Sequence, residues 1–86
     1  MNLLLSLLLV SHDPLCWPRA QWVQQLEQNY AEVQIGQGLH NNDKIIELWV
    51  SEERETWTLL TTYPSGESCI LYAGKYWRNI PQGDPL

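Results

Sequence analysis

Hydrophobic residues recur at intervals of three and four over residues 19–33, a stretch that follows Pro18 and contains no glycine or proline. The apolar positions are Trp22, Val23, Leu26, Tyr30 and Val33. This spacing predicts an amphipathic helix, because side chains three and four residues apart lie on one helix face. Pro18 suits a helix start, where its missing N–H would have no partner. Gly36 and Gly38 are expected to end the helix.

From residue 35 onward the pattern changes to short β-rich runs separated by residues that favour turns. Strands are expected at 35–40, 44–51, 56–63 and 68–73, and a final short strand is expected within 75–80. The connections at 41–43, 52–55 and 64–67 are short, so consecutive strands should be antiparallel. We therefore predict an α+β fold with one N-terminal helix packed on a three- to four-stranded antiparallel meander sheet.

The two cysteines stand just before the predicted helix and in the strand at 68–73. A Cys16–Cys69 disulfide would tie the helix to the sheet and close a loop of about fifty residues, which stabilises a fold by roughly 4 kcal/mol. The core of so short a chain supplies only about 3–5 kcal/mol. The alternative is two unpaired, buried thiols in a cytosolic protein. If Cys69 points at the helix, Leu71 and Ala73 share its inner face, and Ile70 and Tyr72 lie outside.

The five tryptophans and four tyrosines are the most unusual feature of the composition. A domain this small cannot bury them all, and exposed aromatic residues are favoured where a protein meets a partner. Trp49 and Tyr72 fall opposite the strand faces taken as inner. The candidate binding face is Trp49, Tyr72, Tyr76 and Trp77, while Trp22 and Trp57 are expected in the core. Alternatively, the four residues roof a second small core formed by a terminal segment.

Composition and charge narrow the classes of function. A hydrophobic fraction of 44% and a charged fraction of 17% indicate one folded domain of 86 residues. The net charge is −5 and the basic residues are scattered, which argues against nucleic-acid binding.

The apolar run at residues 3–10, followed by a polar break at 11–13, has the length of a signal-peptide core and is too short to span a membrane. No basic residue precedes the run and no Ala-x-Ala site follows it. We expect a leader at 1–12, a single domain at 13–80 and a flexible tail at 81–86, with no stable membrane span in the mature form. The alternative places the leucines in the core of a cytosolic protein.

Catalytic and metal-binding patterns are weak. His12 and His40 are the only histidines, and neither lies in a nucleophile-elbow or His-Glu-x-x-His context. A catalytic Cys69 with His40 as base would need a free thiol. The acidic residues at 52–55, with Asp43, lack the spacing of a calcium loop. We expect no enzyme activity, no cofactor and no metal.

The chain is similar to a group of small exported proteins of unknown function found in bacteria and their phages. That group usually shows a signal peptide, a Cys at the start of the mature chain, a helix ending near Tyr-x-Glu, and a Gly-Thr-Trp-Thr strand followed by a turn and a second Cys. The residues that carry the likeness are Cys16, Arg19, Leu26, Tyr30, Glu32, Gly36, Gly38, Leu39, Glu47, Leu48, Ser51, Thr56, Trp57, Thr58, Thr62, Pro64, Gly66, Cys69, Gly74 and Trp77. The chain departs from the pattern at Arg54-Glu55, where the group commonly places a Gly, and in its leader. The resemblance implies export and the disulfide, and it implies no activity.

These observations favour a non-catalytic binding module, periplasmic or secreted, that engages a protein or an envelope component. The alternative is a structural subunit of a virion or of an envelope assembly, in which the aromatic residues form a permanent interface.

Overall fold

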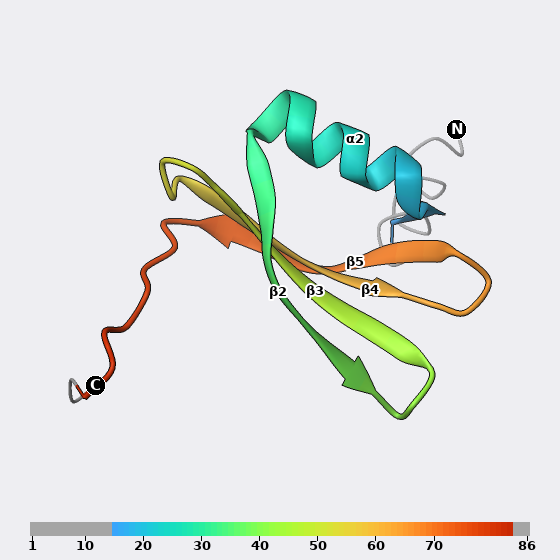
Figure 1. The fold of residues 1–86 in the computed structure, drawn as a ribbon. Coiled ribbons are helices and arrows are strands. Elements are labelled where there is room, and N and C mark those ends of the chain that lie inside the picture. Colours follow the sequence, from blue (N-terminus) through green and yellow to red (C-terminus); the bar gives the residue numbers. More distant parts are fainter. Residues whose placement is uncertain (1–14, 84–86) are drawn as a thin grey trace, which may run out of the picture.

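The computed structural model describes residues 15–83 of the chain. Its elements are β1 (Cys16–Pro18), α2 (Arg19–Tyr30), β2 (Glu32–His40), β3 (Lys44–Ser51), β4 (Thr56–Thr62) and β5 (Glu67–Lys75). The strands form one antiparallel sheet in the order β1-β5-β4-β3-β2. Figure 1 shows α2 lying over one face of this twisted sheet, and the segment after β5 leading away from it. We call the face under α2 the helix-covered face and the other the open face.

The predicted α+β class is confirmed, but the sheet has five strands rather than three to four. The additional strand is β1, whose three residues pair with the start of β5. No periodicity can reveal so short a strand, because it exists only through its partner. The final strand expected within 75–80 is absent from the described residues. Instead, the N–H groups of Tyr76 and Trp77 each donate over 3.0 Å to carbonyls of the β3–β4 turn.

The helix ends three residues earlier than its apolar spacing predicts. Ala31 takes a left-handed conformation with φ of 55°, and its N–H donates to the Leu26 carbonyl. This C-terminal cap turns the chain directly into β2, so Val33 lies in a strand. Gly36 and Gly38, which were expected to end the helix, lie within β2, where a register shift between Gln34 and Gly36 accommodates the irregular sequence.

The core lies between α2 and the helix-covered face. It consists of Trp22, Leu26, Trp49 and Leu60, with Val23 and Ile70 packed against them. Trp49 is 3% exposed and Glu47, on the same side of β3, is 2% exposed. The prediction that Trp49 lies on the outer face is therefore wrong. Local pattern misled it because β3 carries apolar residues on both of its faces.

The faces of Cys69 and Ile70 in β5 were likewise assigned the wrong way round, whereas Tyr72 lies outside as predicted. The Ser68 hydroxyl lies 2.5 Å from that of Thr62 under the helix, and Ile70 packs in the core, so Cys69 between them points to the open face. Leu60 pairs with Ile70 while Leu59 pairs with Tyr72, which leaves Leu71 as the extra residue of a β-bulge. Leu71, expected inside, is 44% exposed. Beyond the bulge, Ala73 returns to the helix-covered face, as predicted.

The predicted Cys16–Cys69 disulfide is confirmed. The two cysteines lie directly opposite each other in β1 and β5, and the Ile70 N–H donates to the Leu15 carbonyl beside them. This places the cysteines at a non-hydrogen-bonded pair, where antiparallel strands approach most closely. Because α2 begins directly after β1, the bridge fixes the start of the helix against the sheet.

Within residues 15–83, no helix is long and apolar enough to pass through a lipid bilayer.

Candidate functional site

An ion pair between half-exposed Arg19 and buried Glu47 joins the start of α2 to the middle of β3. Arg19 Nε donates to Glu47 Oε2 over 2.8 Å, and Arg19 Nη2 donates to Glu47 Oε1 over 2.9 Å. Trp49 Nε1 also donates to Oε1, over 2.9 Å, and the Thr62 hydroxyl donates to Oε2 over 3.3 Å. Each oxygen of Glu47 therefore accepts two hydrogen bonds from the protein itself.

The electrostatic environment of Glu47 is that of a structural carboxylate. Burial acts to raise its pKa, but hydrogen bonds from Arg19 and Trp49, together with the charge of Arg19, outweigh burial and hold the pKa below its usual range. The same pairing raises the pKa of Arg19. Since the Glu47 carboxylate is fully paired, this cluster holds the helix on the sheet, and Glu47 has no oxygen left without a hydrogen bond.

A second buried carboxyl, that of Glu32, is only partly satisfied. Glu32 is 2% exposed, and its Oε2 accepts a 2.8 Å hydrogen bond from the Thr56 hydroxyl. Its Oε1 has no hydrogen-bond partner among the described residues. Burial raises the pKa of Glu32, while the hydroxyls of Thr56 and Thr58 act in the opposite direction. A buried polar atom without a partner costs roughly 1–3 kcal/mol, so Glu32 is the carboxyl that can gain from a ligand.

Local structure places Glu32 and Thr56 side by side. The left-handed turn at Ala31 makes Glu32 the first residue of β2, opposite Ser51 at the end of β3. The Ser51 hydroxyl accepts hydrogen bonds from the N–H groups of Glu55 and Thr56, over 2.9 and 3.1 Å. These bonds organise the β3–β4 turn and bring the start of β4 next to the Glu32 side chain.

Glu32 lines a groove between α2 and the β4–β5 part of the sheet, which we call the α2–β5 groove. Its volume is about 420 Å³. Its apolar walls include Trp17, Trp22, Leu26, Trp57, Ile70 and Ala73. Gly74 allows the Trp57 indole to lie close against β5, because a Cβ at this position would be 2.8 Å from Trp57 Cζ2.

The groove contains one hydrogen-bond acceptor and one donor that have no partner among the described residues. Besides Glu32 Oε1, the buried indole nitrogen of Trp22 has no partner among the described residues. The Trp22 ring is stacked on Trp17 with 4.1 Å between the ring centroids. Among the described lining residues there is no second carboxylate, histidine or thiol. The arrangement can hold an apolar group with polar ends.

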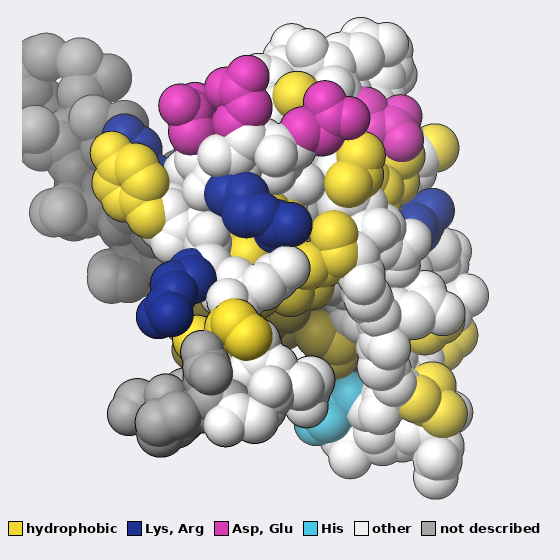
Figure 2. Space-filling view, turned by 60° about the vertical axis from the view of Figure 1, so that its left-hand side comes forward, with side chains coloured by type: hydrophobic (Ala, Val, Ile, Leu, Met, Phe, Trp, Pro, Cys, Tyr) yellow, Lys and Arg dark blue, Asp and Glu magenta, His cyan; other side chains and the backbone are white. Residues whose placement is uncertain are grey.

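The surface near the Glu32 end of the groove is charged. Exposed glutamates occupy the β3–β4 turn directly before Thr56, and exposed Lys75 lines the groove opposite Thr56. Figure 2 shows the side of the molecule that carries this turn, with acidic side chains gathered along the upper edge and hydrophobic and basic side chains exposed below them.

The four aromatic residues predicted to form a binding face do not lie together. Trp49 is buried under α2, whereas Tyr72 and Tyr76 are 68% and 79% exposed. Trp49 pairs with Thr58 and Tyr72 pairs with Leu59, the next residue of β4, so the two side chains lie on opposite faces of the sheet.

Trp77 is half-buried against Trp57, with 5.9 Å between the ring centroids, and its indole N–H donates to Asn79. Trp22 is buried as predicted, but Trp57, also expected in the core, is only half-buried. Glu32 was not among the predicted site residues. A glutamate at the end of an amphipathic helix normally faces water, and only the cap at Ala31 turns this one inward.

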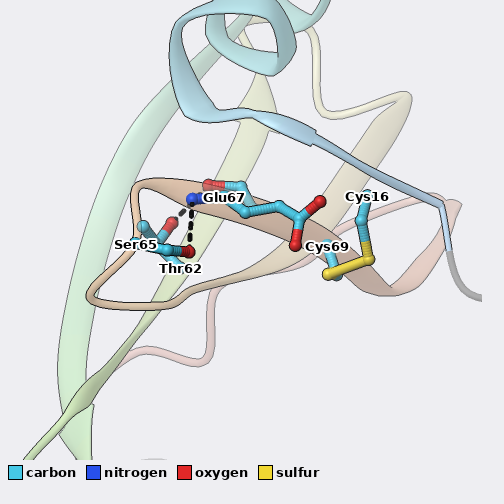
Figure 3. Close-up of a disulfide and its surroundings, with 6 residues drawn as sticks. Cys16, Thr62, Ser65, Glu67 and Cys69 are labelled. Atoms are coloured by element: carbon cyan, nitrogen blue, oxygen red, sulfur yellow. Dashed lines mark hydrogen bonds between the residues drawn. A yellow bond between two sulfur atoms is a disulfide. The ribbon is translucent and has the colours of Figure 1, made fainter.

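The disulfide has one acidic neighbour. Figure 3 shows the Glu67 side chain extending along β5 toward the Cys16–Cys69 bridge. Ligating atoms of these three residues lie within 4.8 Å of one another, the only such grouping among residues 15–83. Both sulfurs are bonded to each other, so the oxidised group offers a metal ion a single exposed carboxylate.

No family model, curated protein or solved structure matches the chain. The resemblance to small exported bacterial and phage proteins stays a prediction, and the function has to be inferred from the chemistry of these residues.

Proposed function

We propose that the protein is a small exported, non-catalytic binding module, and that the α2–β5 groove holds an amphipathic ligand from a protein or an envelope component. Export is proposed from the apolar run at residues 3–10 and from the disulfide, which persists in oxidising compartments. The proposed binding site is this groove, and no longer the aromatic face that was predicted from the sequence.

The observation that carries the proposal is the unpaired Oε1 of Glu32 in an apolar groove. Glu47 demonstrates that this fold can satisfy a buried carboxylate completely. From the residues that the structure describes, Glu32 receives one hydrogen bond through Oε2 and none through Oε1. A donor group on a ligand would remove this cost, and aromatic walls would bind the apolar part of the same ligand.

Two matched small probes test the proposal: n-butylammonium and n-butanol, which share an alkyl chain and differ in the charge of the donor. They are titrated into the ¹⁵N-labelled full chain at pH 7. We expect saturable shifts of the Trp22 and Trp57 indole signals and of the Thr58 amide, with tighter binding of the ammonium. Glu32→Gln should weaken ammonium binding by about tenfold, the effect of losing a charge-assisted bond.

Glu53→Gln removes an exposed acid outside the groove and is the matched control, which should bind as the wild type does. Absence of saturable shifts at the groove with either probe would contradict the proposal.

A structural subunit is the second candidate, and the exposed apolar residues favour it. Leu71 and Tyr72, both at the bulge of β5, are 44% and 68% exposed. An assembly subunit should self-associate in analytical ultracentrifugation, and Tyr72→Ser should return it to monomer. A binding module should sediment as a monomer with and without this substitution.

A further inference from the structure

We propose that the occupant of the α2–β5 groove is an extended peptide, which adds as a strand to the free edge of β5 at residues 71–75 and inserts a lysine side chain toward Glu32. The inference rests on the proposed function and specifies the class of ligand.

The first observation is an edge of β5 that has no neighbouring strand within residues 15–83. β1 pairs only with Glu67–Cys69, and one further bond joins Leu15 to Ile70. Among the described residues, nothing pairs with the same edge of β5 from Leu71 to Lys75, although its other edge pairs with β4. Such an edge presents alternating N–H and C=O groups, and an added strand satisfies them.

The second observation is that this free edge opens into the groove. Ala73 lies on the helix-covered face and pairs with Thr58, and Lys75 pairs with Thr56. Ala73 places only a methyl group between the edge and the threonines that flank the Glu32 carboxyl. Strands are spaced about 4.8 Å apart, so Thr56 and Thr58 lie roughly 10 Å from an added strand. A lysine stem of about 6 Å and a hydrogen bond of about 3 Å span that distance.

The third observation is the chemistry at the end of this path. An unprotonated Oε1 can only accept hydrogen bonds, and an ammonium group supplies both donors and the opposite charge. The indole of Trp22 lines the path, and aromatic faces attract cations and pack well against methylene groups. The net charge of −5 also favours a basic partner.

Lys75, the cationic residue that lines the groove, does not pair with the Glu32 carboxyl. Lys75 is exposed and forms no ion pair within residues 15–83, where the ion pairs are Arg19–Glu47 and Lys44–Asp43. Among residues 15–83, therefore, no cation is paired with the Glu32 carboxyl.

The test uses an acetylated and amidated peptide of sequence Ile-Thr-Lys-Thr-Ile, in which the lysine and both isoleucines share one face of a strand. It is titrated into the ¹⁵N-labelled full chain. We expect the largest amide shifts at residues 71–75. Replacing the lysine with norleucine should weaken binding about tenfold, and Glu32→Gln should abolish that difference, while Glu53→Gln should preserve it.

Backbone methylation tests the strand itself. Alternate N–H groups of a strand point to opposite edges, so N-methylation of one alternate set should abolish binding and methylation of the other set should be tolerated. Ala73→Leu should block the peptide, whereas Ala73→Ser should not. Retention of the disulfide and of the thermal midpoint in each variant shows that the fold is intact.

Several results would overturn the inference. Equal tolerance of both methylated peptides would exclude strand addition, as would amides at 71–75 that are already protected from exchange by the chain's own residues before Leu15 or by a second copy. If the peptide fails while n-butylammonium still binds in the groove, the peptide inference fails and the proposed function survives. If both fail, both are wrong.

Discussion

Removal of the Arg19 guanidinium should destabilise the protein in a manner that depends on pH. Arg19→Met keeps an apolar stem at this position and deletes both hydrogen bonds to Glu47. Each bond to a charged group contributes roughly 1.5–3 kcal/mol, but the Arg19 side chain is 41% exposed and Trp49 and Thr62 remain as donors. We therefore expect a loss of about 2–3 kcal/mol at pH 7, a large share of the stability of so small a domain.

The pH dependence follows from the direction of the pKa shift. In the folded protein the pKa of Glu47 is lowered. The ionised carboxylate therefore adds to the stability of the fold above the unfolded carboxyl pKa of about 4.3, and this stabilisation is lost as pH falls through the pKa that Glu47 has in the folded state. In Arg19→Met, the effect of burial, which raises the pKa of Glu47, is opposed only by the hydrogen bonds from Trp49 and Thr62. The pKa of Glu47 should therefore rise. The difference in stability between the two proteins should be full at pH 7 and should shrink below about pH 4.

The assay is urea unfolding followed by tryptophan fluorescence at pH 7 and pH 3. Lys44→Met is the control, because the Lys44–Asp43 pair is wider, at 3.4 Å, and lies at the surface, so its loss should change stability by no more than about 0.5 kcal/mol. A loss below about 1 kcal/mol for Arg19→Met, or an equal loss at both pH values, would refute the structural role assigned to the ion pair.

Three further tests concern the Glu32 carboxyl, the disulfide and the two faces of the sheet. In urea unfolding at pH 7, Glu32→Gln should leave the stability unchanged or raise it by up to about 1 kcal/mol. This gain should vanish as pH falls below the raised pKa of Glu32, because protonation of the wild-type carboxyl removes the same buried charge. A loss of stability above about 2 kcal/mol would show that the charge of Glu32 is structural. Joint replacement of Cys16 and Cys69 by serine should cost roughly 4 kcal/mol, measured against the oxidised protein whose bridge non-reducing mass spectrometry verifies. Trp49→Ser should cost at least about 3 kcal/mol and Tyr72→Ser less than about 1 kcal/mol in the same assay; similar costs would contradict their placement on opposite faces.

Features that depend on local sequence were predictable. The strand at Lys44–Ser51 and the start of the helix at Arg19 lie where the pattern places them. Both follow from short-range rules: the alternation of side chains along a strand and the tolerance of Pro18 before a first helical turn.

Features that depend on distant partners were not predictable. A charged residue such as Glu47 is expected at the surface. Its burial is compensated by hydrogen bonds from Arg19, which lies 28 residues away in the sequence. The bulge at Leu71 breaks the alternation of β5, so Cys69 and Tyr72 share the open face, although alternation places them on opposite faces. Glu32 became a site residue only because one left-handed residue, Ala31, ends the helix before it. The candidate groove therefore came from the structure alone, while the disulfide was accessible from the sequence.

The cross-strand disulfide also makes the middle of the chain a closed covalent ring. Cys16 and Cys69 are 53 residues apart, and the intervening chain contains α2, β2, β3 and β4. A protease that cuts once, at the exposed 41–43 turn or among the exposed residues 52–55, opens this ring without releasing any part of it. Both products stay linked through the sulfur atoms, and the cut ends remain within reach of each other. Nicked molecules should therefore migrate as one species without reductant and as two with it.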